Sequence, residues 1–116
     1  MTRPVVHFEI RGRDPKGLRD FYSALFGWQM REDPAINYTF IEHGAGGPAE
    51  GVGGGIVAAD APRVLVYVQV ADLRETLRRA EELGGKAVMQ PIDIPNGPTI
   101  AEAEDPEGNR VGLIQQ

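Results

Sequence analysis

The sequence contains no cysteine, which excludes disulfide bonds, thiolate catalysis and thiolate metal sites. It has no apolar run near the roughly 18 residues needed to cross a bilayer, and residues 1–4 lead directly into a strand pattern with no signal-peptide segment. Basic residues are in the minority, with 12 Lys and Arg against 17 Asp and Glu. A net charge of −5 disfavours nucleic acid and anionic membranes as partners, because both need a basic surface. We therefore expect a cytoplasmic protein with neither partner.

What the sequence does contain is a strand pattern that occurs twice, 58 positions apart, at residues 5–11 and 64–70. From residues 7 and 65 onward, the even-numbered residues are apolar and the odd-numbered ones are larger or polar. The odd-numbered residues are His7, Glu9 and Arg11 in the first stretch and Leu65, Tyr67 and Gln69 in the second. Because side chains alternate between the two faces of a strand, one face of each strand is expected to pack and the other to line a site.

A helix pattern follows each of these strands. Residues 15–26 place apolar side chains at spacings of three and four, after Asp14 as a candidate N-cap and before Gly27 as a terminating glycine. The second helix begins after Asp72, which lies 58 positions beyond Asp14, and ends at Gly84. The repeat therefore extends beyond the strands.

Three further strands are expected after each helix. They are residues 28–31, 37–42 and 51–57 in the first half, and residues 86–90, 99–104 and 110–115 in the second. Residues 43–55 are rich in glycine, which within a strand indicates either close approach of a neighbouring group or an open space beside it. The order βαβββ thus occurs twice, in module one (1–58) and module two (63–116) of a single domain spanning 1–116. This is an α+β fold, and the strand count after each helix disfavours the alternative of a ferredoxin-like sheet dimer.

The core is expected to contain apolar residues of these strands and helices, namely Phe8, Ile10, Phe21, Leu25, Val66, Val68, Leu77 and Leu83. Glu102 and Glu104 share one face of a strand and are interpreted as a solvated face. His43 precedes a glycine in a loop and is expected to be solvated as well.

Three segments of the chain carry a resemblance to a known family. They are residues 7–10 followed by 21–28 (Phe-Tyr-Ser-Ala-Leu-Phe-Gly-Trp), residues 70–73 followed by 80–85, and residues 105–113. In this order and spacing the chain resembles the glyoxalase / bleomycin-resistance / extradiol-dioxygenase (vicinal oxygen chelate) superfamily. It is most similar to a small glyoxalase-like branch whose members mostly have no assigned reaction.

The resemblance implies an architecture and a set of positions for a metal. The two modules would pair into a half-open, curved, barrel-like sheet with the helices outside and a cleft inside. Metal-dependent members carry ligands on the first and last strands of each module, and these positions fall on His7, Gly54, Leu65 and Gly112. Only His7 offers a side-chain donor, whereas a catalytic divalent site needs about three protein ligands. We therefore expect no metal and no other cofactor.

His7 and Glu9 are the candidate catalytic residues, as an acid/base or hydrogen-bonding pair. The alternative is that they remain from a ligand set or bridge the two modules. The candidate ligand-binding residues are Trp28, Tyr38, Tyr67 and Gln69, because aromatic walls with a few polar groups suit a small apolar or planar ligand. For the aromatic residues the alternative is plain core packing.

We expect a glyoxalase-like protein that binds a small molecule in the cleft between its modules without the family metal. If it is an enzyme, a lyase or isomerase-type activity on a small carbonyl or epoxide-like substrate is expected. Two other classes stay open, a metal-dependent lyase or dioxygenase and a drug- or metabolite-sequestering protein. A homodimer is expected, with modules paired within one chain or swapped between chains.

Overall fold

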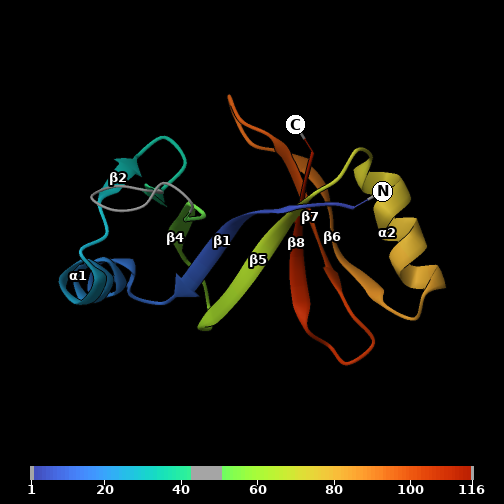
Figure 1. Cartoon of the computed structure of the whole chain (residues 1–116), viewed down its shortest axis with the longest axis horizontal. Coiled ribbons are helices and arrows are strands. Elements are labelled where there is room, and N and C mark those ends of the chain that lie inside the picture. The colour runs from blue at the N-terminus through green and yellow to red at the C-terminus, as the bar shows by residue number, and fades with distance from the viewer. Residues whose placement is uncertain (1, 43–50, 116) are drawn as a thin grey trace. The chain divides into compact units, whose positions relative to one another are not determined.

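The computed structural model describes residues 2–42 and 51–115 (Figure 1). The elements in chain order are β1 (Val5–Gly12), α1 (Pro15–Phe26), β2 (Met30–Asp33), β3 (Tyr38–Ile41), β4 (Gly54–Ala58), β5 (Arg63–Gln69), α2 (Leu73–Glu82), β6 (Lys86–Asp93), β7 (Thr99–Glu104) and β8 (Arg110–Gln115). The predicted α+β class and the βαβββ order of each half are confirmed, with three strands after each helix. His43 lies outside the described residues.

The chain divides into two compact units, which are described separately. The first unit consists of the described residues of 7–64, and the second of those of 65–116 together with residues 1–6. The first residues of the chain therefore belong with the second module, because the backbone N–H of Gln69 donates to the carbonyl oxygen of Pro4 at 2.9 Å. This boundary differs from the predicted division at residues 58 and 63, since β1 contributes to both units.

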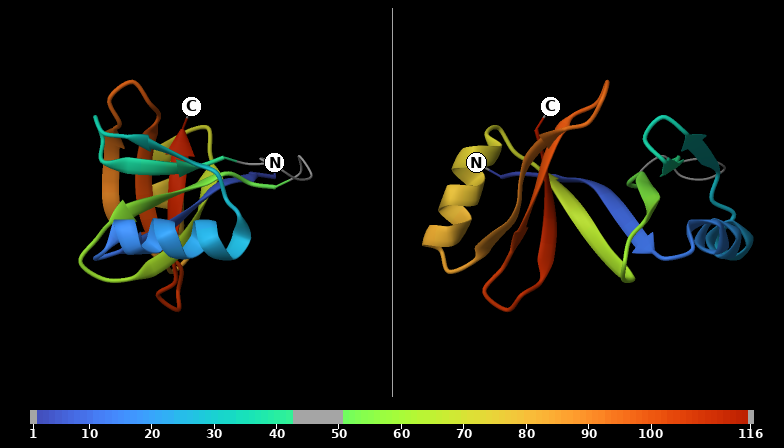
Figure 2. Two further views of the ribbon diagram at one scale, coloured as in Figure 1. Left: turned by 90° about the vertical axis from the view of Figure 1, so that its left-hand side faces the viewer. Right: turned by 180° about the vertical axis from the view of Figure 1, so that it is seen from behind.

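The first unit is a four-stranded sheet in the order β2-β3-β4-β1, with β1 parallel to β4 and the other neighbours antiparallel. Helix α1 lies against the strands of this unit (Figure 2). Its core consists of Ile10, Ile41 and Ile56, packed against Phe8, Leu18, Tyr22, Trp28 and Met30. The alternation predicted for β1 is confirmed here, because its even-numbered side chains pack in this core.

Helix α1 begins and ends where its sequence predicts. The side chain of Asp14 accepts a hydrogen bond from the backbone N–H of Gly17 at 3.0 Å, and Pro15 occupies the first helical turn. Gly27 adopts a φ of 68°, and its N–H donates to the Ser23 carbonyl at 2.9 Å. A left-handed φ is accessible to glycine without strain, so the residue both stops the helix and turns the chain towards β2.

Four of the residues expected in the core are exposed instead. The exposed fractions are 57% for Phe21, 58% for Leu25, 63% for Leu83 and 42% for Val66. In both helices the apolar face predicted from the sequence is wider than the part of the helix that contacts the sheet. Phe21, Leu25 and Leu83 lie outside that contact, and Val66 lies on β5. In α1 the exposed Phe21 ring still contacts the half-buried Tyr22 ring, which it meets edge-on at 5.0 Å.

The second unit repeats the arrangement of the first. Its sheet has the order β5-β8-β7-β6, with β5 parallel to β8 and antiparallel pairing elsewhere. Helix α2 covers a core of Val70, Leu73, Leu77, Ala101, Ala103 and Leu113. A second cluster contains the odd-numbered residues Leu65 and Tyr67 of β5 with Ile114. Both faces of β5 are therefore apolar, whereas β1 has polar residues on one face.

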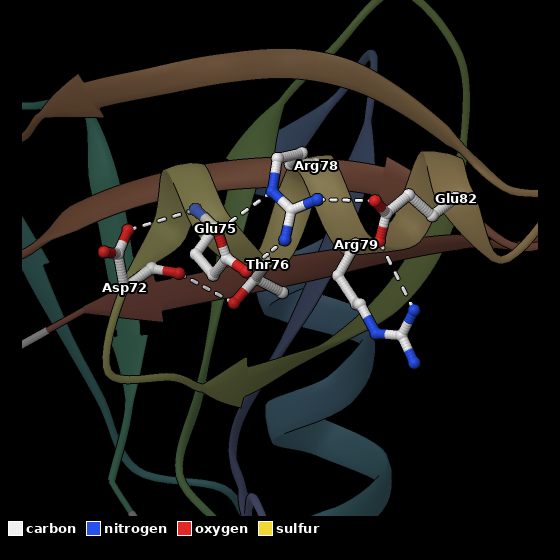
Figure 3. A network of polar contacts seen from close by, with 6 residues as sticks. All are labelled: Asp72, Glu75, Thr76, Arg78, Arg79 and Glu82. Carbon is white, nitrogen blue, oxygen red and sulfur yellow. Dashed lines mark hydrogen bonds and ion pairs between the residues drawn. The ribbon is translucent and has the colours of Figure 1, made fainter.

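Helix α2 carries a network of polar contacts on its exposed surface (Figure 3). The Asp72 side chain accepts from the backbone N–H of Glu75 at 3.1 Å, which confirms the predicted N-cap. The Arg78 guanidinium contacts the carboxylates of Glu75 and Glu82. Such exposed pairs contribute little individually, so the cap is the stronger determinant of where the helix begins. In the part of the chain that the structure describes, no helix is long and apolar enough to cross a membrane.

Replacement of Asp72 by alanine is expected to lower the free energy of unfolding by about 1 kcal/mol, because the Glu75 N–H loses its partner. Asp72→Asn keeps an equally good N-cap and serves as the matched control. The check is urea denaturation followed by circular dichroism. Equal losses in the two variants would show that the charge of Asp72 matters and its capping hydrogen bond does not.

Candidate functional site

The candidate site is the sheet face of the first unit that is opposite α1. The side chains of His7, Glu9 and Arg11 alternate with the core residues of β1, and the register places Glu9 directly beside Gly55 of β4. Phe40 of β3 lies opposite Gly55, and Tyr38 is two residues away on the same strand. We call this surface the His7 face and define it by these side chains and Gly55: His7, Glu9, Arg11, Tyr38, Phe40 and Gly55.

A continuous chain of hydrogen bonds links four side chains of the His7 face. The Nε2 atom of His7 lies 2.8 Å from the hydroxyl oxygen of Tyr38. The Tyr38 hydroxyl donates to Oε1 of Glu9 at 2.8 Å. The other carboxylate oxygen, Oε2, accepts from Nε of Arg11 at 2.6 Å. The structure therefore brings together His7, Glu9 and Tyr38, which the sequence predicts as site residues, and adds Arg11.

Burial makes the contacts of Glu9 energetically important. Glu9 is only 5% exposed, and Arg11 forms an ion pair with it from the same strand. A carboxylate out of water requires partners, because an unpaired buried charge costs several kcal/mol. Arg11 and Tyr38 supply a charge and a hydrogen bond. Glu9 is therefore held in one position, and the groups bound to it are held with it.

The same surroundings affect the protonation of His7. Burial lowers the pKa of His7 below its ordinary value of 6.5, and the neighbouring Glu9 carboxylate opposes this with a smaller upward effect. Desolvation disfavours the charged imidazolium form. His7 is consequently a neutral imidazole near pH 7, which can accept a hydrogen bond or a proton.

Gly55 allows the Tyr38 side chain to cross β4 and reach β1. A Cβ atom at residue 55 would lie 2.1 Å from the ring and hydroxyl atoms of Tyr38. Any side chain there would displace the tyrosine from Glu9 and His7. The sequence left two explanations for glycine in this strand, close approach of a neighbouring group or an open space beside it. The structure confirms close approach, and the approaching group is the Tyr38 side chain.

The 58-residue offset fails by one position in β4. It predicts Gly54 as a ligand position, but Gly54 pairs with Phe8, and a Cβ there would meet the Phe8 ring. Phe8 contacts Trp28 on the α1 side of the sheet. Gly54 therefore faces away from His7, and Gly55 is the residue beside Glu9. A shift of one residue moves a side chain to the other face of a strand.

Trp28 is part of an aromatic cluster on the α1 side. Its ring stacks on Tyr22 at 5.3 Å with an interplanar angle of 12°, and it lies 5.1 Å from the Phe26 ring. The structure thus does not place Trp28, a predicted ligand-binding residue, on the His7 face. Trp28 packs against the core of the first unit, which is the alternative that the sequence left open for it.

Tyr67 and Gln69 belong to the second unit. Tyr67 is 4% exposed and lies over Gly112, where a Cβ atom would come within 2.6 Å of its ring. Gln69 is half-buried on the same strand. The expectation that these residues bind the same ligand as His7 stays a prediction.

Glu102 is a buried acid that the sequence analysis misplaced. It is 5% exposed, pairs in register with Gly112, and has Arg110 Nη1 at 3.7 Å. The prediction of a solvated face is therefore wrong for Glu102. Its place between two alanines, Ala101 and Ala103, is the signal in the sequence that could have indicated a buried strand.

The donor set of the His7 face does not fit a metal of the family type. Among residues 2–42 and 51–115, no three His, Asp or Glu side chains gather where they could hold an ion. His7 and Glu9 are joined through the hydroxyl of Tyr38. The neighbouring position on β4 is a glycine under that same ring. We therefore derive no chemical step through a metal.

These observations define a class of protein, an α+β fold of two βαβββ units with a hydrogen-bonded histidine on one sheet face. Residues 7–114 match the glyoxalase-like domain, and the chain belongs to that family. It is 31% identical over 108 residues to a glyoxylase-like domain-containing protein of Didymella fabae, covering 87% of this chain and 84% of the relative.

Solved structures of low sequence identity share the fold. A glyoxalase/bleomycin resistance protein/dioxygenase superfamily member from Vibrio splendidus 12B01 is 16% identical, with a TM-score of 0.66, over 99% of this chain and 100% of that one. Methylmalonyl-CoA epimerase from Mycobacterium tuberculosis is 15% identical, with a TM-score of 0.63, over 96% and 86% of the two chains. The superfamily suggested by the sequence is confirmed.

The burial of His7 predicts a pH dependence of stability. Its pKa is lowered in the folded state, so the unfolded chain binds the proton first as the pH falls through about 6.5, and stability falls with it. The free energy of unfolding is expected to decrease between about pH 7.5 and 5.5. The chain has two histidines, so His43→Gln is compared with His43→Gln/His7→Gln. A steeper decrease is expected where His7 is present, and equal slopes would contradict the assignment.

Proposed function

We propose that this chain binds a small organic molecule on the His7 face, that His7 exchanges a hydrogen bond or proton with it, and that no metal takes part. The observation that carries the proposal is the hydrogen-bond chain from His7 through Tyr38 to Glu9 and Arg11. A protein orders buried polar groups in this way at a cost, because each must be partnered. A site that orients a ligand is a use for such an arrangement.

The charge and ring content of the His7 face support a neutral, planar ligand. Glu9 is compensated by Arg11, and His7 is neutral near pH 7. Tyr38 and Phe40 meet edge-to-face, with centroids 4.9 Å apart. Arg31 lies 4.6 Å above the Phe40 ring and also pairs with Glu42. Aromatic surface beside a few fixed polar groups suits a flat organic molecule without a net charge.

The geometry supports different roles for the two candidate catalytic residues. Each oxygen of Glu9 already accepts a hydrogen bond, one from Tyr38 and one from Arg11. His7 is the more exposed of the pair and is held in its neutral form by burial. We therefore assign ligand contact and proton exchange to His7, and orientation of Tyr38 and His7 to Glu9.

A second candidate function is proton transfer at carbon, as in an isomerase-type reaction. The neutral His7 imidazole favours it, since a general base must be unprotonated at the working pH. His7 would take a proton from a carbon next to a carbonyl group and return it to the same molecule, so that no oxidant or reductant is required. The fold neighbour from M. tuberculosis is a methylmalonyl-CoA epimerase, which supports this candidate by analogy of fold alone.

The remaining interpretations differ from these in measurable ways. A sequestering protein would bind its ligand without any turnover. A metal-dependent lyase or dioxygenase would hold stoichiometric metal. Homodimerisation, a cytoplasmic location and a ligand position between the modules also stay predictions.

Ligand binding is tested by thermal shift with a library of neutral, planar carbonyl and phenol fragments. Fragments that stabilise the wild type are expected to lose most of their effect with His7→Ala, because the contact group is removed. Arg79→Ala is the control, since Arg79 lies on the exposed surface of α2 in the other unit. Full retention of every shift in His7→Ala would rule out the His7 face as the binding surface.

Metal independence is tested on the purified protein by elemental analysis and by titration with zinc, nickel, manganese and iron(II). Substoichiometric metal and no change in melting temperature are expected, because two donors bridged by a hydroxyl do not form a three-ligand site. His7→Ala should behave in the same way. Stoichiometric metal that is lost in His7→Ala would overturn the proposal and direct the search to glyoxalase and dioxygenase chemistry.

A further inference from the structure

A cavity of about 600 Å³ lies within the first unit, between the first turns of α1 and the turn that joins β2 to β3. Its lining includes Arg19 of α1, Glu32 and Asp33 of β2, Asn37 of the turn, Thr39 of β3 and Ile56 of β4. We call it the Thr39 cavity. It is large enough for a small organic molecule, because ligand pockets commonly enclose roughly 300–1,000 Å³.

The floor of the Thr39 cavity is on the opposite side of the sheet from the His7 face. Thr39 alternates along β3 with Tyr38 and Phe40, whose side chains belong to the His7 face, so its own side chain points to the α1 side. Thr39 also pairs in register with Ile56, which belongs to the core on the α1 side. A molecule on this floor is therefore separated from the His7 face by the sheet.

Thr39 is a buried polar residue whose hydroxyl lacks a partner. It is 3% exposed, and among residues 2–42 and 51–115 its hydroxyl forms no hydrogen bond. A hydroxyl that is buried without a hydrogen bond costs free energy, and native proteins rarely leave one in that condition. Because Thr39 lines the cavity, a molecule within the cavity can supply the partner.

Asp33 presents a second acceptor to the Thr39 cavity. Its Oδ1 atom accepts from the backbone N–H of Ala35 at 3.1 Å, and its backbone carbonyl accepts from the N–H of Ile36 at 3.3 Å. These two bonds fix the side chain at the start of the turn. Within the described residues the other oxygen, Oδ2, has no partner, so it can accept from a ligand.

The ionic groups of the cavity sum to a negative charge. Nη2 of Arg19 lies 3.4 Å from Oε1 of Glu32, so one carboxylate already matches the guanidinium and Asp33 is left uncompensated. The N-terminus of α1 does not reverse the sign, because Asp14 caps it by accepting from the N–H of Gly17. The charge that complements this cavity is therefore positive.

We propose that the Thr39 cavity is a second ligand site, separate from the His7 face, and that it binds a small molecule with a protonated amine and an apolar body. An ammonium group has three hydrogens to donate and accepts none. Asp33 Oδ2 and the Thr39 hydroxyl oxygen supply acceptors for it, and Ile56 supplies apolar surface for the body. Binding of such a molecule satisfies both the uncompensated charge and the buried hydroxyl.

The ligand class is tested with three probes of similar shape: 3-methylbutylamine, 3-methylbutan-1-ol and 4-methylpentanoate. Each is titrated near pH 7 into ¹⁵N-labelled protein, followed by amide chemical shifts. The amine is expected to shift the amides of Asn37, Thr39 and Ile56 and to bind at least about tenfold more tightly than the alcohol, since hydrogen bonds to charged groups contribute this factor. A preference for the carboxylate would overturn the ligand class. Saturable shifts from none of the probes, or shifts confined to the His7 face, would overturn the site.

Asp33→Asn removes the charge of Asp33 and keeps an oxygen that can accept from the Ala35 N–H. Affinity for the amine is expected to fall at least about tenfold, because the ammonium loses its ionic partner. Asp20→Asn is the matched control, since Asp20 is exposed on α1 and pairs with Lys16. The control should keep the wild-type affinity. Equal affinities in folded Asp33→Asn and in the wild type would overturn the role of Asp33.

Thr39→Val removes the hydroxyl and keeps the branched shape of the side chain. Its melting temperature is expected to equal or exceed that of the wild type, because the hydroxyl has no bond to lose, while its affinity for the amine falls. Thr76→Val is the contrasting control, since the Thr76 hydroxyl donates to the Asp72 carbonyl at 2.7 Å, and its melting temperature should fall. A similar fall in Thr39→Val would show that Thr39 is satisfied within the protein and would overturn the argument.

Discussion

The buried carboxylate of Glu9 is the constraint on which the His7 face depends. A nearly inaccessible charge must be matched, and it is matched by Arg11 on its own strand and by Tyr38 from β3. Removing a partner from such a pair typically costs roughly 3–5 kcal/mol. That requirement fixes Tyr38, and Tyr38 in turn requires glycine at residue 55. Three strands are thereby committed to one arrangement of side chains.

The second unit places different residues at the corresponding positions of its first strand. The positions 58 residues beyond His7 and Glu9 are Leu65 and Tyr67, and both are buried in an apolar cluster. Tyr67 again lies over a glycine, Gly112, so close contact between a tyrosine ring and a glycine occurs in each unit. The backbone pattern is repeated, but the buried carboxylate of the second unit is Glu102 of β7, paired with Arg110, and not a residue of β5.

Sequence patterns predict the fold well because they reflect local physics. The alternation in β1 and the caps at Asp14 and Asp72 depend on neighbouring residues, and all are confirmed. Contacts between strands depend on register, which the sequence does not specify. The repeat offset therefore led to Gly54 where the structure has Gly55 beside Glu9, and Glu102 was predicted to be solvated although it is buried. His7 and Glu9 were predicted as a pair and Tyr38 separately, but their hydrogen-bond chain required the pairing of β3, β4 and β1.

The division of β1 between two units means that Pro4, just before this strand, lies beside β5 of the second unit. The carbonyl of Pro4 accepts from the N–H of Gln69, so the first residues of the chain lie beside β5, whose other neighbour is β8. An uncovered strand edge is a template for pairing with other chains. Proline can accept at such an edge but has no N–H to donate. Pro4 therefore satisfies a donor of β5 through its carbonyl oxygen and, because it lacks an N–H, leaves no donor of its own that needs a partner.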